Sequence, residues 1–305
     1  MTVGVVFGSI TPPERIARVA RLAEDLGFGE LWFSEDCYFS GGMAGVAQIL
    51  AATDRIPVGT GAVSAVTRHP AITAMEFAGL ARMYPGRVRP GVALGVRHWL
   101  DQMGLLPARP LTALHETVTV LRELFAGKEV SFDGTAHRLD RIMLDHPPPA
   151  ALPIHVAAVN EKALRLSAGI ADGTILSVLS SPAYVRWARG LVGPDHRLTT
   201  FALYAVDRDG DRARESVRDA AAMFLSAEAD SALVRVPGID ATLRPVPDDV
   251  LDRVTVAGTP DEVVAKLRRL YDAGSDAIGL WLFPTGDAER VATLTAREVL
   301  PRLTR

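Results

Sequence analysis

Short hydrophobic runs alternate with longer amphipathic stretches from one end of the chain to the other. Each short run is rich in Val, Ile and Leu and closes in a turn, and in the stretch that follows, apolar residues recur every three or four positions. This alternation is typical of parallel strands joined by helices. We count eight such units, with strands expected at residues 3–7, 30–34, 56–61, 88–95, 154–157, 173–177, 198–206 and 277–283.

Two of the expected helices begin with the same signal. Residues 11–14 and 259–262 both place Thr three positions before Glu with Pro between them, which is the pattern of a capping box with Pro in the first turn. In the fourth strand Pro90 has no amide donor, which leaves open whether the strand begins at Val88 or only at Gly91.

Two segments interrupt the alternation. Residues 127–139 carry short apolar stretches on either side of an Asp-Gly pair and predict a small hairpin, within an insertion near 127–150. Near residues 227–253 the periodicity disappears and prolines accumulate, which marks a long loop of the kind that is often functional. We expect both insertions to decorate a single domain that spans residues 1–305.

Eight strand and helix units in 305 residues favour an α/β fold of the closed (β/α)8 TIM-type barrel class. A doubly wound open sheet is disfavoured because no Gly-x-Gly-x-x-Gly fingerprint opens the first helix. In a closed barrel of this type the active site lies where the strands end. Candidate site residues therefore follow the strands, in the segments 7–8, 35–36, 61–64, 95–99, 157–160, 177–179 and 283–284.

The composition excludes several classes of protein. A formal net charge of -3, from 33 Lys and Arg against 36 Asp and Glu, provides no basic field for nucleic acid. No apolar run approaches the roughly 20 residues that cross a bilayer. Cys37 is the only cysteine, so an internal disulfide cannot form, and we expect a cytoplasmic protein that acts on a small molecule.

Glu35 and Asp36 are the clearest ionisable pair at a predicted catalytic position, because they directly follow the second strand. Either carboxylate could act as a general acid or base if desolvation raised its pKa, and either could instead cap the following loop. A metal site is not expected because His69, His98 and His155 do not cluster in the sequence. A Ser-His-Asp triad is disfavoured as well, since no Gly-x-Ser-x-Gly elbow is present.

Other positions at the barrel mouth suit a bound ligand. Gly61 and Gly95 remove side chains where two strands end, which lets a flat ligand approach the backbone, although a glycine there can equally be a bulge. Asn160 opens a helix whose free amides suit a phosphate, with Lys162 adding charge, or it serves only as the cap. Further candidates for stacking or for a lid are the mouth-loop aromatics Tyr38, Phe39 and Trp99.

Several segments, taken in their order and spacing, resemble the bacterial luciferase-like family across the whole chain. Within that family the resemblance is to the branch that uses the deazaflavin coenzyme F420, typified by methylenetetrahydromethanopterin reductase. The segments that carry it are 32–36, 58–73, 86–88, 91–95, 99–104, 168–173, 256–262 and 273–276.

The resemblance implies an F420-dependent oxidoreductase on a TIM-type barrel, with the deazaflavin lying across the strand ends. A non-prolyl cis peptide, which forms a bulge behind the ring in relatives, falls here at Gly61-Ala62. The cofactor-binding residues implied by the resemblance are Gly61, Ala62, Val63, Ser64, Gly95, Ala158, Val159 and Asn160, the last three for the phosphate. We expect the substrate pocket to include Phe7, Tyr38, Phe39, His98 and Trp99, and relatives are often homodimers.

The sequence departs from the family in two places. Many F420 relatives place histidine at the end of the second strand, where this chain has Asp36, and several place an acid where Val96 stands here. Asp36 could be the proton donor, or the substrate could take its proton from water. An F420H2-dependent reductase is the first hypothesis, an FMN-dependent monooxygenase the second, and a barrel that binds a cofactor without turnover the third.

Overall fold

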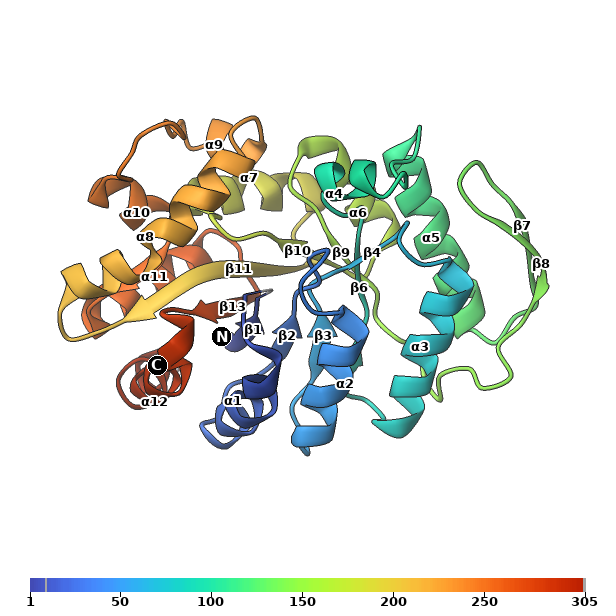
Figure 1. The fold of residues 1–305 in the computed structure, drawn as a ribbon, viewed down its shortest axis with the longest axis horizontal. Helices are drawn as coiled ribbons and strands as arrows, with labels where there is room; N and C mark the ends of the chain where they lie inside the picture. Colours follow the sequence, from blue (N-terminus) through green and yellow to red (C-terminus); the bar gives the residue numbers. More distant parts are fainter. Residues whose placement is uncertain (9, 304–305) are drawn as a thin grey trace.

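The computed structural model describes residues 1–8 and 10–303 and places the parallel strands in a closed ring surrounded by helices (Figure 1). The ring closes because the last strand, β13 (Ala277–Leu282), pairs in parallel both with β1 (Thr2–Phe7) at the start of the chain and with β11 (Arg197–Val206). The prediction of a TIM-type barrel is therefore confirmed. The strands of the ring are β1 (Thr2–Phe7), β2 (Leu31–Phe33), β3 (Val58–Thr60), β4 (Val63–Ser64), β5 (Val88–Arg89), β6 (Gly91–Ala93), β9 (His155–Ala157), β10 (Gly173–Leu176), β11 (Arg197–Val206) and β13 (Ala277–Leu282).

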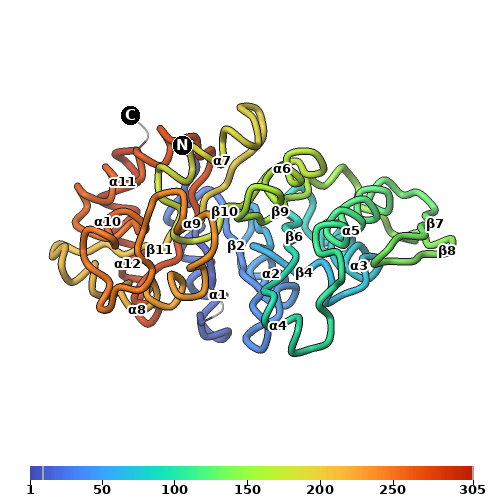
Figure 2. Tube along the Cα trace, turned by 90° about the horizontal axis from the view of Figure 1, so that it is seen from above, coloured from blue at the N-terminus to red at the C-terminus, as the bar shows by residue number. Residues whose placement is uncertain are grey.

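Helices follow the strands and lie outside the ring, as the view from above also shows (Figure 2). Their apolar faces pack on the outer side of the sheet, because residues along a strand alternate between the two faces. The helices are α1 (Pro13–Asp25), α2 (Gly42–Ala52), α3 (Pro70–Met83), α4 (Arg97–Gln102), α5 (Pro110–Phe125), α6 (Glu161–Ile170), α7 (Pro182–Val192), α8 (Gly210–Ala227), α9 (Ala232–Arg235), α10 (Asp248–Val254), α11 (Pro260–Asp272) and α12 (Ala288–Glu298).

The third and fourth strands of the barrel are each split into two pieces. β3 pairs with β5 and β4 pairs with β6, so the ladder continues on both sides of each break. The break between β5 and β6 is Pro90, whose carbonyl accepts a hydrogen bond from the His155 amide at 2.7 Å. The fourth strand therefore begins at Val88, before the proline, and Pro90 interrupts it without ending it.

The two predicted capping boxes have different outcomes. Thr259 caps α11, with its hydroxyl accepting from the Glu262 amide and the Glu262 carboxylate accepting from the Thr259 amide, so this prediction is confirmed. The box at Thr11 is wrong, because α1 begins at Pro13 and its N-cap is Pro12, which has no side-chain acceptor. Two consecutive prolines moved the helix start one residue past the position that the pattern indicated.

The first insertion contains the predicted hairpin, formed by β7 (Val130–Asp133) and β8 (Arg138–Ile142) in antiparallel pairing. Its turn is held to α5 by Glu116, whose carboxylate accepts from the amides of Thr135, Ala136 and His137 at 2.7 to 3.1 Å. These bonds lower the pKa of Glu116, although its burial acts in the opposite direction.

The second insertion is less irregular than its prolines suggested. It contains the short helices α9 and α10, and it leads into β12 (Val256–Gly258), a strand that the pattern missed and that pairs with β11. Arg214 of α8 forms ion pairs with Asp252 of the insertion at 3.0 Å and with Glu262 of α11 at 2.5 Å, which connects the insertion to both helices. In the described part of the chain no helix is long and apolar enough to span a bilayer.

Candidate active site

A cavity of about 470 Å³ opens at the carboxyl ends of the strands, where the barrel rule places an active site. Residues from most strands of the ring reach it, together with three helices. Its walls are formed by Val6, Ser34, Glu35, Asp36, Gly61, Ala62, Ala93, Leu94, Gly95, Val96, Leu111, Leu114, Ala157, Ala158, Val159, Asn160, Lys162, Ala163, Ile175, Ser177, Val178, Phe201, Phe224 and Trp281.

Glu35 is bound on both carboxylate oxygens. Arg68 donates to its two oxygens at 2.7 and 2.6 Å, and the Gly42 amide at the start of α2 donates to one of them at 2.7 Å. Two parallel bonds from a guanidinium hold a carboxylate in one orientation. Glu35 thus joins the loop after β2 to the residues that precede α3, and its carboxylate is occupied by this role.

Asp36 follows on the same loop and lines the cavity. The Glu35–Arg68 pair fixes the backbone immediately before it. Cys37 comes next, and burial together with the charges of Glu35 and Asp36 raises the pKa of its thiol, so the thiol is protonated at neutral pH. Both Glu35 and Asp36 thus line the cavity, and the carboxylate of Glu35 is held by Arg68.

The break between β3 and β4 holds the cis peptide bond Gly61-Ala62, where the resemblance placed it. A Cβ at Gly61 would lie 2.6 Å from the ring of Phe201, so no side chain fits there. Gly95 has φ +101°, a conformation that side-chain-bearing residues rarely adopt, and a Cβ there would lie 2.9 Å from the Ser64 hydroxyl. At both positions bare backbone faces the cavity.

The turn from β9 into α6, with Ala158, Val159 and Asn160, forms the neighbouring part of the wall, because β9 pairs with β6. Asn160 makes no side-chain cap to its own helix. Its amide oxygen instead accepts from the Ala232 amide at 3.0 Å, at the start of α9. The first amides of α6 are consequently left without a side-chain acceptor, next to Lys162, which suits an anion. Tyr184 steadies this turn by donating to the Val159 carbonyl at 2.6 Å.

Some predicted residues lie outside the cavity wall. Val63 and Ser64 are buried behind the bulge, where the Ser64 hydroxyl donates to the Leu94 carbonyl at 2.9 Å. The assignment of Phe7 to the pocket needs correction: its ring belongs to the core between barrel and helices, and Val6 points inward in its place, since neighbouring strand residues face opposite sides.

The four mouth-loop residues of the predicted pocket stand at the rim. Tyr38 and Phe39 are 65% and 57% exposed, and His98 is exposed as well. The Tyr38 hydroxyl donates to the Trp99 carbonyl at 3.4 Å, which links the loops after the second and fourth strands. None of the four lines the cavity, and their contact with a substrate stays a prediction.

Sequence reasoning missed the aromatic wall formed by Phe201, Phe224 and Trp281. Phe201 and Trp281 stand inside strands that are buried on both faces, so alternation could not tell which residues point inward. Phe224 lies in the last turn region of α8, and only tertiary packing brings that turn to the mouth.

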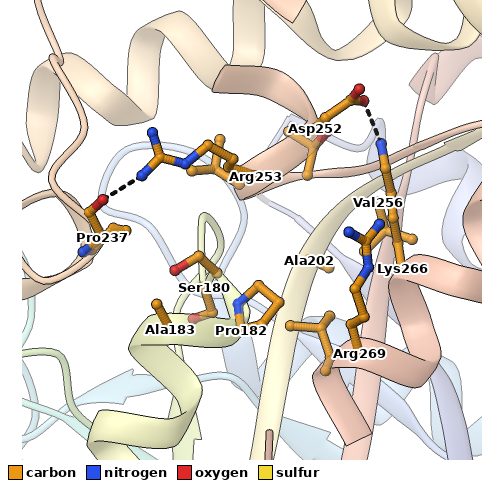
Figure 3. Close-up of a pocket in the computed structure, with 14 residues that line it drawn as sticks. Ser180, Pro182, Ala183, Ala202, Pro237, Asp252, Arg253, Val256, Lys266 and Arg269 are labelled. Carbon is orange, nitrogen blue, oxygen red and sulfur yellow. Dashed lines mark hydrogen bonds and ion pairs between the residues drawn. The ribbon is translucent and has the colours of Figure 1, made fainter. Parts of the chain in front are cut away.

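A second, smaller cavity of about 160 Å³ lies between the start of α7 and the helices α10 and α11 (Figure 3). It shares no wall residue with the first cavity. Its cations are mostly engaged: Lys266 donates to Asp252 and to the Ala257 carbonyl, both at 2.6 Å, and Arg253 donates to the Pro237 carbonyl. Among the described residues no cluster of His, Cys, Asp and Glu could hold a metal ion.

Comparison with known proteins identifies the family. The sequence profile of the luciferase-like monooxygenases matches residues 3–277. The chain belongs to this family. Relatives that span it are 5,10-methylenetetrahydromethanopterin reductase of Methanolobus tindarius, 27% identical over 98% of this chain and 100% of the relative, and F420-dependent glucose-6-phosphate dehydrogenase of Nakamurella multipartita, 28% identical over 95% and 93%.

A solved luciferase-like structure shares the fold. The coenzyme F420-dependent tetrahydromethanopterin reductase from Methanopyrus kandleri superposes with a TM-score of 0.89 at 22% identity, over 99% of each chain. This likeness shows the fold, and the profile match over residues 3–277 confirms the predicted family. These relatives of the luciferase-like chain are F420-dependent oxidoreductases, although the family description names monooxygenases.

Proposed function

We propose that this luciferase-like protein is an oxidoreductase that uses coenzyme F420. Its reaction is the transfer of a hydride from F420H2 to a C=C, C=N or C-O centre of a small molecule, or the reverse. One observation carries the proposal: the bulge at Gly61-Ala62, which carries no side chain larger than a methyl group, and the uncapped start of α6 line the same cavity. A flat ring with a phosphate-bearing tail needs both features in one place.

The residues present fit F420. Gly61, Ala62 and Gly95 would lie against the deazaflavin ring, since two of them carry no side chain and Ala62 carries only a methyl group, which leaves room for a flat group. The amides at the start of α6, with Lys162, would hold the phosphate. FMN shares the flat ring and the phosphate, so the same features would also admit it, and the titration below separates the two.

When bound, F420H2 supplies a hydride at ring carbon 5. The protein positions the partners and handles the proton. Asp36 at the cavity wall carries the proton that completes the reduction of a C=C or C=N bond. Arg68 and Glu35 are positioning residues, because they hold the loop on which Asp36 stands.

Parallel titrations of the purified apoprotein with F420 and FMN, followed by fluorescence or calorimetry, test this function. We expect micromolar or tighter binding of F420 and much weaker binding of FMN. The reverse preference, with oxygen consumption by the reduced flavin complex, would make the protein a flavin monooxygenase. F420 binding without turnover on any substrate of a broad panel would favour a non-catalytic barrel.

We further propose that two copies associate through α3. Along one face of this helix Ile72, Met75 and Met83 are 46%, 54% and 64% exposed, although a helix with apolar residues on every side is usually covered. Met75→Glu should shift sedimentation from dimer to monomer, whereas Met223→Glu, at a similarly exposed position of α8, should not. A monomeric unaltered protein would contradict the proposal.

A cytoplasmic location also remains a proposal.

A further inference from the structure

Helix α6 begins beside the active-site cavity without a side-chain cap. Asn160 stands at the N-cap position with φ -95° and ψ 157°, an extended conformation from which Asn commonly caps a helix, yet its side chain accepts from no amide of α6. The amides of Lys162 and Ala163, which such a cap would bind, have no acceptor among the described residues. Both residues line the cavity, so two donors are available where the phosphate is proposed to lie.

The second insertion holds the side chain of Asn160. The Asn160 amide oxygen accepts from the amide of Ala232, the first residue of α9, at 3.0 Å. Ala232 is fully buried, and its amide has no other acceptor within the part of the chain that the structure describes. A buried amide without an acceptor costs more free energy than an amide that solvent can reach. The Ala232 amide therefore competes successfully with α6 for the Asn160 oxygen.

The turn from β9 into α6 is also held from α7. The hydroxyl of Tyr184 donates to the Val159 carbonyl at 2.6 Å, and Tyr184 is fully buried. Helix α7 itself is capped by its own N-cap residue, because the Ser181 hydroxyl accepts from the Tyr184 amide at 3.1 Å. Two contacts from distant parts of the chain thus fix the turn, and neither of them uses an amide of α6.

We propose, on the basis of the proposed F420 cofactor, that Asn160 and Tyr184 are positioning residues for the cofactor phosphate, and that Asn160 couples the second insertion to phosphate binding. While Asn160 is bound to Ala232, the first amides of α6 are open to an anion. An Asn160 side chain released by the insertion would cap α6 and occupy a donor that the phosphate needs. Because phosphate binds only the first arrangement, it must in turn stabilise the contact between Asn160 and Ala232.

Two deazaflavins that differ only in the phosphate test the role of the turn. One is FO, which has the ring and the ribityl chain of F420, and the other is FO 5′-phosphate. We expect the unaltered protein to bind FO 5′-phosphate at least tenfold more tightly than FO in fluorescence titrations. Equal affinity for the two would show that the start of α6 does not hold the phosphate and would overturn the proposal.

Tyr184→Phe removes only the hydroxyl that holds Val159. The affinity for FO 5′-phosphate should fall about fivefold, while the affinity for FO should change by less than twofold. Tyr204→Phe is the matched control, because Tyr204 is also fully buried, its hydroxyl is paired with that of Thr295 at 2.8 Å, and it does not line the cavity. A purely structural role of Tyr184 would lower the thermal stability of both variants and leave the ratio of the two affinities unchanged, which would overturn its assignment.

Ala232→Pro tests the coupling from outside the cavity, because it removes the donor to Asn160 and leaves every lining residue in place. Pro is well tolerated at the first position of a helix. FO 5′-phosphate should bind about tenfold more weakly, and FO should change by less than twofold. The control is Asp248→Pro at the first residue of α10, whose amide has no acceptor among the described residues, and it should change neither affinity. Unchanged binding of FO 5′-phosphate in Ala232→Pro would overturn the coupling.

Hydrogen exchange on the unaltered protein measures the same coupling without any substitution. At saturation with either ligand, the Ala232 amide should exchange more slowly with FO 5′-phosphate bound than with FO bound, because only the phosphate favours the contact with Asn160. Equal exchange rates in the two complexes would contradict the coupling, including in the case that Ala232→Pro does not fold.

Failure of this inference is distinguishable from failure of the proposed function. F420 affinity is measured first, on the unaltered protein. A protein that does not bind F420 contradicts the proposed function. A protein that binds F420 but does not distinguish FO 5′-phosphate from FO contradicts only the inference about Asn160 and Tyr184.

Discussion

Strand β2 carries a glutamate just before it and another just after it, and each is paired with an arginine. Glu30, at the closed end of the barrel, is 1% exposed and accepts from Arg197 at 2.8 Å and from the Trp32 indole at 2.9 Å. Glu35, at the open end, accepts two bonds from Arg68. At the closed end of the barrel the Glu30–Arg197 pair connects two strands, and at the open end the Glu35–Arg68 pair holds the loop of the site.

The difference lies in which segments each pair joins. Glu30 reaches Arg197 on β11, across the barrel interior, so breaking this pair would loosen the ring itself. Glu35 joins only neighbouring loops, and its loss would leave the strands paired. A charged pair at the closed end should thus affect unfolding, whereas a charged pair at the open end should affect catalysis.

The largest expected effect concerns the open end and Asp36. Asp36→Asn keeps the shape of the side chain and removes the proton that it transfers, so we expect turnover with an authentic substrate to fall about 100-fold. F420 affinity, measured by fluorescence, should stay within threefold. Unchanged turnover would remove Asp36 from the mechanism and leave water as the proton source.

Gly61→Val should weaken F420 binding about 30-fold, which corresponds to about 2 kcal/mol, because the added side chain overlaps Phe201 and must shift the bulge against which the ring is proposed to lie. Gly169→Ala on α6 is the matched control, since a Cβ there meets nothing within 4 Å. Thermal unfolding should show that both variants fold. Normal F420 affinity in Gly61→Val would refute the placement of the ring.

At the closed end, Glu30→Gln should lower the free energy of unfolding by about 2 kcal/mol, because it leaves a partly buried arginine without its charge partner. Its F420 affinity should be unchanged. The exposed pair Glu123–Lys128 supplies the control, and Glu123→Gln should cost less than about 0.5 kcal/mol in urea unfolding. If both substitutions lowered the free energy of unfolding equally, the Glu30–Arg197 pair would not stabilise the barrel more than a surface pair does.

Arg68→Ala should lower kcat about tenfold with a smaller change in KM, because the loop that carries Asp36 loses its anchor. Arg68→Lys should recover part of the loss, since Lys keeps the charge but not the paired bonds. Arg82→Ala, on the same helix region and exposed, should leave kcat intact. A loss confined to unfolding stability would make the Glu35–Arg68 pair purely structural.

The smallest effect is a pH dependence at the closed end. His155 is buried beside Trp32, and burial together with Arg197 and Arg89 lowers its pKa from 6.5 to about 4. Between pH 6.5 and about 4, His155 is therefore protonated in the unfolded chain and neutral in the folded chain. The stability that neutral His155 contributes is complete above pH 6.5 and is lost as the pH falls towards 4.

Urea unfolding at pH 7.5 and 5.5 should show a loss of about 1 kcal/mol at the lower pH for the unaltered protein. His155→Gln, which does not titrate, should reduce this difference, and F420 affinity should not change at either pH. The same pH dependence in both proteins would assign it to other groups.

Much of the architecture was determined by the sequence alone. Hydrophobic periodicity is a local property, so the eight units, the hairpin after α5 and the cap at Thr259 could be predicted from neighbouring residues. The strand ends then followed from the barrel rule, and this brought Asp36, Gly61, Gly95 and Asn160 to one cavity.

What only the tertiary structure decided is the direction and partner of each side chain. Strands buried on both faces have no polar alternation, so Val6 rather than Phe7, and Trp281 among its neighbours, were assigned to the interior only by packing. The partners of Glu35 and Asn160 are 33 and 72 positions away in the chain. Contacts over such separations arise from how strands and helices pack, and local sequence patterns do not encode them.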